Sequence, residues 1–72
     1  METRLAQFMA ANGITSEQLA TAAGVAASTV EDVRRGRTDP KRPTIAWMAG
    51  AATRILHRRV RARELFDLGD DE

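Results

Sequence analysis

The chain has 72 residues with no cysteine and one histidine, which excludes disulfides and thiolate metal sites and leaves too few ligands for a usual zinc site. No run of about 18 apolar residues is present to span a membrane, and the N-terminus lacks a signal-peptide pattern, so we expect a cytoplasmic protein without membrane contact. The net charge of +1 hides a basic centre: residues 34–63 carry ten Lys or Arg and one Asp, which indicates a polyanionic partner more strongly than the net charge does, with a solvated basic face as the alternative.

Apolar residues recur at helical spacing along the chain, and no strand-like alternation is present, so the sequence predicts an all-α fold. The first helix is expected over residues 3–12, where Leu5, Phe8 and Met9 form one apolar stripe. Gly13 ends this helix, because glycine adopts the left-handed backbone conformation of a helix C-terminus without a Cβ clash.

A second helix is expected over residues 16–23, and its start carries a complete capping signal. Thr15 can cap the first turn while Gln18 reaches back to it. Ile14, just before the cap, can pack on Leu19 as a hydrophobic staple. The inward residues of this helix are Leu19, Ala20 and Ala23.

Gly24 separates this helix from a third helix, expected over residues 27–35. Val30 and Val33 form its buried pair. Ala26 at its start offers no capping oxygen, so the first N–H groups of the helix stay open to an anion.

Gly36 ends the third helix, and the proline-containing loop 37–43 leads to a fourth helix that starts near Thr44. Its apolar face is expected to comprise Ile45, Met48, Ala52, Ile55 and Leu56. Trp47 lies off that face and suits either a cover at the core edge or a dimer contact. Whether residues 44–66 form one helix or two stays open, because no glycine or proline lies between the last two apolar patterns.

We expect a single domain over residues 1–67, followed by an acidic, frayed tail at residues 68–72. A chain this short buries only roughly 60% of its unfolded surface. Because no disulfide or metal can support the fold, we expect it to dimerise.

Two short helices joined by a three-residue turn with a glycine form a helix-turn-helix unit. Residues 14–37, ITSEQLATAAGVAASTVEDVRRGR, resemble the helix-turn-helix core of the Cro/C1-type (XRE-family) DNA-binding domains. The similarity rests on TSEQLA, the AAGV turn, STV and RRGR, and RVRARELF resembles the hydrophobic end of such domains. It implies a compact, lambda-repressor-like bundle of four to five helices. Such a domain binds double-stranded DNA as a homodimer on a near-palindromic operator, as small phage-type repressors do.

The chain departs from the family pattern at three places. Ser16 stands where a glutamine often contacts a phosphate. Arg59 stands where a glycine usually separates the last two helices, and the loop 37–43 is longer than usual.

In a helix-turn-helix complex with DNA, the second helix of the unit lies in the major groove. The residues on the outward face of the third helix that would then meet base edges are Ala27, Ser28, Asp32 and Arg35. Ala27 can touch a thymine methyl, Ser28 can donate or accept a hydrogen bond, and Asp32 can accept from a cytosine amino group. Arg35 can bind a guanine or a phosphate, or it can pair with Asp32 instead. Glu31 would repel the DNA backbone unless it reaches a base edge or pairs with Arg35.

Phosphate contacts are expected from the hydroxyl and basic side chains around this helix, namely Thr15, Ser16, Thr29, Arg34, Arg37, Lys41 and Arg42. Most of the arginines between residues 54 and 63 are assigned to a solvated face.

These features predict a sequence-specific transcriptional regulator, and a repressor, because the chain carries no second domain for polymerase or an effector. The alternatives are a protein-binding module that uses Glu31 and Asp32, or the antitoxin of a toxin–antitoxin pair. The composition provides no nucleophile–base pair or glycine-rich phosphate loop. We therefore expect no enzymatic activity, cofactor, metal or small-molecule ligand.

Overall fold

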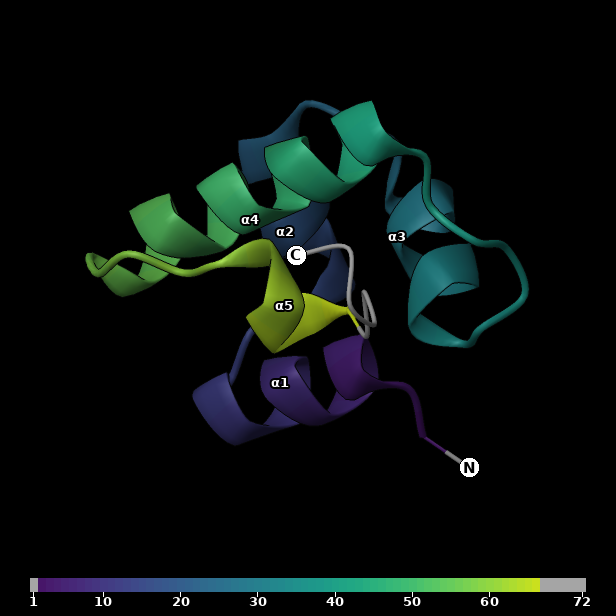
Figure 1. The fold of residues 1–72 in the computed structure, drawn as a ribbon, viewed down its shortest axis with the longest axis horizontal. Coiled ribbons are helices and arrows are strands. Elements are labelled where there is room, and N and C mark those ends of the chain that lie inside the picture. Colours follow the sequence, from purple (N-terminus) through teal and green to yellow (C-terminus); the bar gives the residue numbers. More distant parts are fainter. Residues whose placement is uncertain (1, 67–72) are drawn as a thin grey trace.

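The computed structural model describes residues 2–66, which form five helices and no strand (Figure 1). The helices are α1 (Arg4–Asn12), α2 (Ser16–Ala23), α3 (Ala27–Arg34), α4 (Arg42–Leu56) and α5 (Ala62–Leu65). This arrangement confirms the expected all-α bundle. The acidic tail expected at residues 68–72, and the domain boundary at residue 67, lie outside the described residues.

The first two helices begin and end as their local sequence predicts. Thr3 caps α1 by accepting from the Ala6 N–H, and Gly13 follows with a left-handed φ of 65°. The capping box at the start of α2 is complete: the Thr15 hydroxyl accepts from the Gln18 N–H at 3.1 Å, and the Gln18 side chain accepts from the Thr15 N–H at 2.9 Å. These caps satisfy N–H groups that a helix cannot pair internally.

The tight connection between α2 and α3 depends on Gly24, whose φ is 75°. At the far end of α3, the Gly36 N–H donates to the Val33 carbonyl at 3.1 Å, and the Arg37 N–H donates to the Asp32 carbonyl at 2.8 Å. This pair of bonds is a Schellman motif, and Gly36 supplies its left-handed residue with a φ of 76°. Both glycines therefore end their helices as predicted.

The fourth helix begins at Arg42, two residues earlier than expected, because Pro43 is accommodated in the first turn. It ends at Leu56, where His57 takes a left-handed φ of 55°. The region 44–66 therefore forms two helices, and a histidine rather than a glycine makes the break.

Thr53 ties the segment after that break to α4. Its hydroxyl donates to the Ala49 carbonyl at 2.9 Å and accepts from the Val60 N–H at 2.9 Å. Val60 and Leu65 are both buried, so this segment returns to the core before and within α5.

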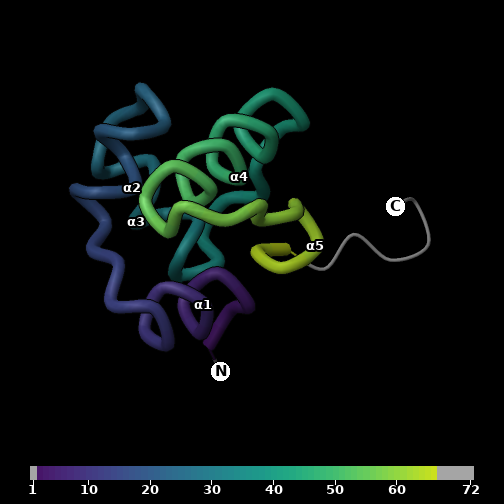
Figure 2. The backbone as a smooth tube through the Cα atoms, turned by 90° about the vertical axis from the view of Figure 1, so that its left-hand side faces the viewer, coloured from purple at the N-terminus to yellow at the C-terminus, as the bar shows by residue number. Residues whose placement is uncertain are grey.

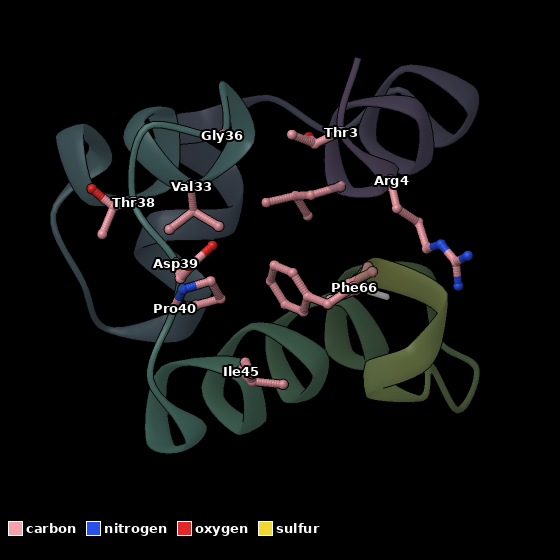
Figure 3. Close-up of a pocket in the computed structure, with 11 residues that line it drawn as sticks. Thr3, Arg4, Val33, Gly36, Thr38, Asp39, Pro40, Ile45 and Phe66 are labelled. Atoms are coloured by element: carbon pink, nitrogen blue, oxygen red, sulfur yellow. The ribbon is translucent and has the colours of Figure 1, made fainter. Parts of the chain in front are cut away.

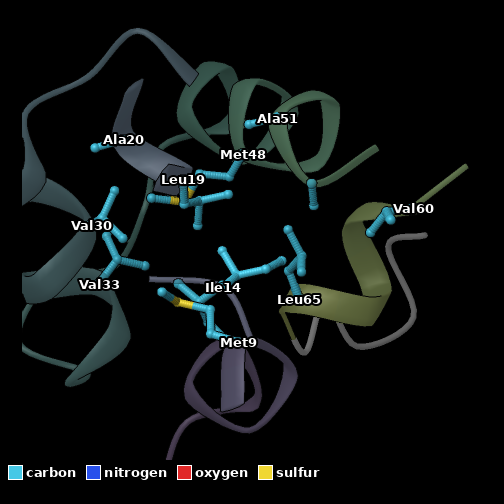
Figure 4. Packing of buried hydrophobic residues seen from close by; sticks show 12 residues of the cluster. Met9, Ile14, Leu19, Ala20, Val30, Val33, Met48, Ala51, Val60 and Leu65 are labelled. Atoms are coloured by element: carbon cyan, nitrogen blue, oxygen red, sulfur yellow. The ribbon is translucent and has the colours of Figure 1, made fainter. Parts of the chain in front are cut away.

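The core lies where all five helices converge (Figure 4). Its largest fully buried side chains are Leu5, Leu19, Val30, Met48 and Leu65. The α2 helix packs against both α3 and α4, while α1 packs against α5 and α3. In side view, α4 lies between the α2–α3 pair and α5, with α1 closing the bundle (Figure 2).

Some residues expected in the core lie at its edge instead. Phe8, Ala23, Ile45, Ile55 and Leu56 are half-buried. The interior of α4 uses Ala51 as well as Ala52, both with no exposed surface, because close helix packing against α2 leaves room only for small side chains. Trp47 is 52% exposed and is not part of the core.

Candidate nucleic-acid interface

The α3 helix buries one face and exposes the other. Val30 and Val33 are buried, which turns Ser28 and Thr29 outward into solvent. Ala27 and Asp32, also predicted to read bases, are half-buried, and Ala27 packs against the core. The exposed face near the start of α3 therefore consists of small side chains that allow another molecule to approach the backbone.

The N-terminus of α3 carries no side-chain cap. Ala26 occupies the cap position without a side-chain hydrogen bond, and the first turn holds no acidic residue. The first N–H groups of a helix have no partner within it and lie at the positive end of its dipole. This end of α3 can therefore accept an anion, as the sequence indicates.

Glu31 joins α2 to α3 through a set of hydrogen bonds. Its Oε1 accepts from the Ser16 hydroxyl and from Arg34 Nε, the latter at 3.1 Å. Its Oε2 accepts from Arg34 Nη2 at 2.9 Å and from Arg35 Nε at 3.1 Å. Each carboxylate oxygen thus receives two donors.

This environment favours the charged form of Glu31. The hydrogen bond from Arg34, followed by that from Ser16, lowers the pKa of Glu31 to about 2. The same carboxylate raises the pKa of Arg34. Both groups therefore stay ionised at neutral pH.

Three residues predicted to contact DNA, namely Ser16, Arg34 and Arg35, therefore already bind Glu31. The Ser16 hydroxyl has one proton, which it donates to Glu31, so it cannot donate to a phosphate at the same time. The guanidinium groups of Arg34 and Arg35 both bind Glu31.

The alternative pairing of Arg35 with Asp32 is wrong: Arg35 lies one helical turn from Glu31 and pairs with that longer side chain instead. A glutamate three and four residues before two arginines is a sequence signal for this arrangement. The bond from Ser16 has no such signal, because it depends on how α2 and α3 cross.

The start of α2 is less suited to phosphate than expected. The oxygen of exposed Thr15 accepts the capping bond of α2. Glu17 lies in the first turn of this helix. Glu2, Glu17 and Glu31 line one groove of about 470 Å³ beside it, with Arg34 as the cation at its wall.

The loop between α3 and α4, together with the first residue of α4, carries three exposed cations, Arg37, Lys41 and Arg42, which we call the basic loop. Within residues 2–66 these side chains form no ion pair. The start of α4 resembles that of α3, since Lys41 at the cap position makes no side-chain hydrogen bond and the first turn has no acidic residue. Figure 1 shows α3, this loop and the start of α4 at the same end of the molecule.

In the rest of the basic segment, Arg54 lies on α4, Arg58 and Arg59 follow its end, and Arg61 and Arg63 lie at the start of α5 and within it. Arg54 donates to the Ala22 carbonyl at 3.1 Å, which ties α4 to α2. Arg58 pairs with Glu64 at 3.2 Å. The basic segment of the sequence is therefore distributed over α3, the basic loop, α4 and the chain from the end of α4 to α5.

A second hollow lies between the basic loop, α1 and α5 (Figure 3). It has a volume of about 370 Å³, and its apolar wall includes Leu5, Val33, Ile45 and Phe66. Arg37, Lys41 and Arg42 do not line this hollow, so it lies apart from the three cations of the basic loop.

No helix of residues 2–66 has the length and hydropathy needed to cross a membrane. The same part of the chain holds no group of three or more acidic or histidine side chains arranged for a metal ion. Comparison of the chain with models of known protein families, with curated proteins and with solved structures gives no match.

Proposed function

We propose that the chain is a sequence-specific regulator of transcription that binds double-stranded DNA, represses its target and acts as a homodimer on a near-palindromic operator. The observation that carries the proposal is the exposed face of α3: its N-terminus is uncapped and bears small exposed side chains, and the chain that follows α3 carries three cations without an ion pair among the described residues.

The dimensions of α3 suit the major groove. An α-helix with its side chains is about 10–12 Å across, which matches the major-groove width of about 12 Å, and the eight residues of α3 form such a helix. Ser28 would offer its hydroxyl to base edges, and the methyl groups of Ala27 and Thr29 would contact thymine. Asp32 would accept from a cytosine amino group, since no described residue pairs with it.

Phosphate groups would bind on both sides of α3. The basic loop supplies three cations, and the open N-terminus of α3 supplies backbone N–H groups; the start of α4 supplies fewer, because Pro43 in its first turn has no N–H. These contacts set position and general affinity but carry no sequence information directly.

Selection of bound fragments from random duplex DNA, followed by mobility shift on the enriched sequence, tests this proposal. We expect one enriched motif with two-fold symmetry. If no motif is enriched and no duplex shifts at low salt, the chain does not act by binding DNA.

A protein-binding module is the second candidate, and the carboxylates of Glu2, Glu17 and Glu31 beside the start of α2 favour it, because they would repel a phosphate backbone. An antitoxin would combine both activities. A partner that co-purifies with the chain in place of DNA supports the module, and a toxin that co-purifies with a DNA-bound chain supports the antitoxin.

A further inference from the structure

The arginines nearest the exposed face of α3 are not free. Arg34 presents Nε and Nη2 to the two oxygens of Glu31 as a two-pronged contact, at 3.1 and 2.9 Å. Arg35 adds a third bond at 3.1 Å. A guanidinium binds a phosphate through the same two-pronged geometry, so a DNA phosphate and Glu31 compete for the same donors.

This competition is unfavourable to the phosphate. Removing the arginines from Glu31 would leave a carboxylate without its partners beside a negatively charged backbone. The Ser16 hydroxyl also holds Glu31 in place from α2, so the carboxylate cannot simply swing away with the arginines.

Resting on the proposed function, we propose that Glu31 is a specificity-determining residue that withholds Arg34 and Arg35 from DNA phosphates. General affinity for duplex DNA is thereby kept low, and stable binding depends on the base contacts of α3. Asp32 has no comparable role, since it pairs with neither arginine within the described chain.

The test is Glu31→Gln, which keeps the side-chain length but removes the charge and one of the two acceptor oxygens. We expect the variant to bind a non-cognate duplex about tenfold more tightly in 0.1 M salt for each phosphate contact it gains. With one or two such contacts, the slope of log affinity against log salt steepens by about 0.9 to 1.8. The ratio of cognate to non-cognate affinity falls accordingly.

Glu17→Gln is the matched control, because it removes the same charge from the neighbouring helix at a residue without an ion pair among the described side chains. Equal gains in affinity for the non-cognate duplex in the two variants would overturn the inference and leave DNA binding itself intact.

The triple variant Glu31→Gln, Arg34→Gln, Arg35→Gln should lose this gain in affinity. If it retains the gain, the arginines are not its source, and the inference is wrong. A wild-type chain that binds no duplex would instead refute the proposed function.

A measurement on the wild-type chain covers the case in which Glu31→Gln does not fold. The Nε–H resonances of Arg34 and Arg35 are followed by NMR while a non-cognate duplex is added. We expect them to stay in place while signals of the basic loop move. Movement of both arginine signals would show that they reach phosphates and would overturn the inference.

Discussion

Arg37 is the cation whose position is best fixed relative to α3. Its backbone N–H closes the Schellman motif through the Asp32 carbonyl at 2.8 Å, while its side chain is exposed and unpaired within the described chain. The side chain can therefore be truncated without removing the bond that ends the helix.

We expect Arg37→Ala to weaken binding to all duplexes alike and to reduce the salt slope by about 0.9, the value for one phosphate contact. The measurement is fluorescence anisotropy on cognate and non-cognate duplexes over a range of salt. Arg59→Ala is the control, since that exposed arginine lies beyond the far end of α4. An unchanged slope for Arg37→Ala would refute the phosphate role of this residue.

Glu31 also makes the stability of the fold depend on pH in the acidic range. Hydrogen bonds from Arg34 and Ser16 lower its pKa from 4.5 to about 2, so the folded chain binds this proton less readily than the unfolded chain does. The resulting stabilisation is fully present above about pH 4.5 and is lost as the pH falls towards 2.

We therefore expect the free energy of unfolding, measured with urea, to decline less between pH 4.5 and 2 in Glu31→Gln than in the wild-type chain. The N–H of Arg61, followed by the side chain of Arg58, lowers the pKa of Glu64 as well, so the comparison must be made between variant and wild type. Parallel pH profiles for the two chains would mean that Glu31 does not carry this effect.

At the scale of the elements, local signals predicted the helix ends that side-chain caps or glycines make. Thr15 with Gln18 starts α2, and Gly13, Gly24 and Gly36 end the first three helices, because each signal acts within one turn. The end of α4 carried no such signal. His57 adopts the left-handed conformation there because Thr53 binds Val60 and the core buries Val60, which are tertiary constraints.

His57→Gly tests that explanation. Glycine adopts a φ of 55° without the steric cost that a Cβ imposes, but it also gains freedom in the unfolded chain. We expect a net stabilisation of roughly 0.5–1 kcal/mol, measured by urea unfolding. Ala46→Gly, at an exposed position inside α4, should instead cost about 1 kcal/mol. A destabilised His57→Gly would mean that the histidine side chain itself supports the turn.

The candidate site was only partly predictable for the same reason. The helical period of Val30 and Val33 placed Ser28, Ala27 and Asp32 on the outward face, but only Ser28 of the three is exposed, while Ala27 and Asp32 are half-buried. The contact of Ser16 with Glu31 lies between residues 15 positions apart, and it follows from how two helices cross. The number of hydroxyl and basic residues in the sequence is therefore larger than the number of side chains that the fold leaves free to bind phosphate.

For the whole molecule, the length of α4 determines how charge is distributed. The sequence carries one basic segment, but 15 helical residues separate its parts by roughly 22 Å at 1.5 Å each. The basic loop lies beside α3, while Arg58 and Arg59 lie beyond the opposite end of α4 (Figure 1). Under the proposed function, α3 and the basic loop meet DNA, while Arg58 and Arg59 stay away from it.

The size of the bundle makes the spacing of the two half-sites testable. Half-sites of a helix-turn-helix dimer lie about 34 Å apart on one face of the duplex. The longest Cα extent of the chain is 27 Å, so side chains of two bound copies can meet across the gap that remains.

Five added base pairs between the half-sites would rotate one copy by about half a turn to the other face and should abolish cooperative binding. The measurement is the Hill coefficient from mobility shift, with five base pairs added outside the operator as the control. Cooperativity that survives the central insertion would mean that the two copies do not touch on the DNA.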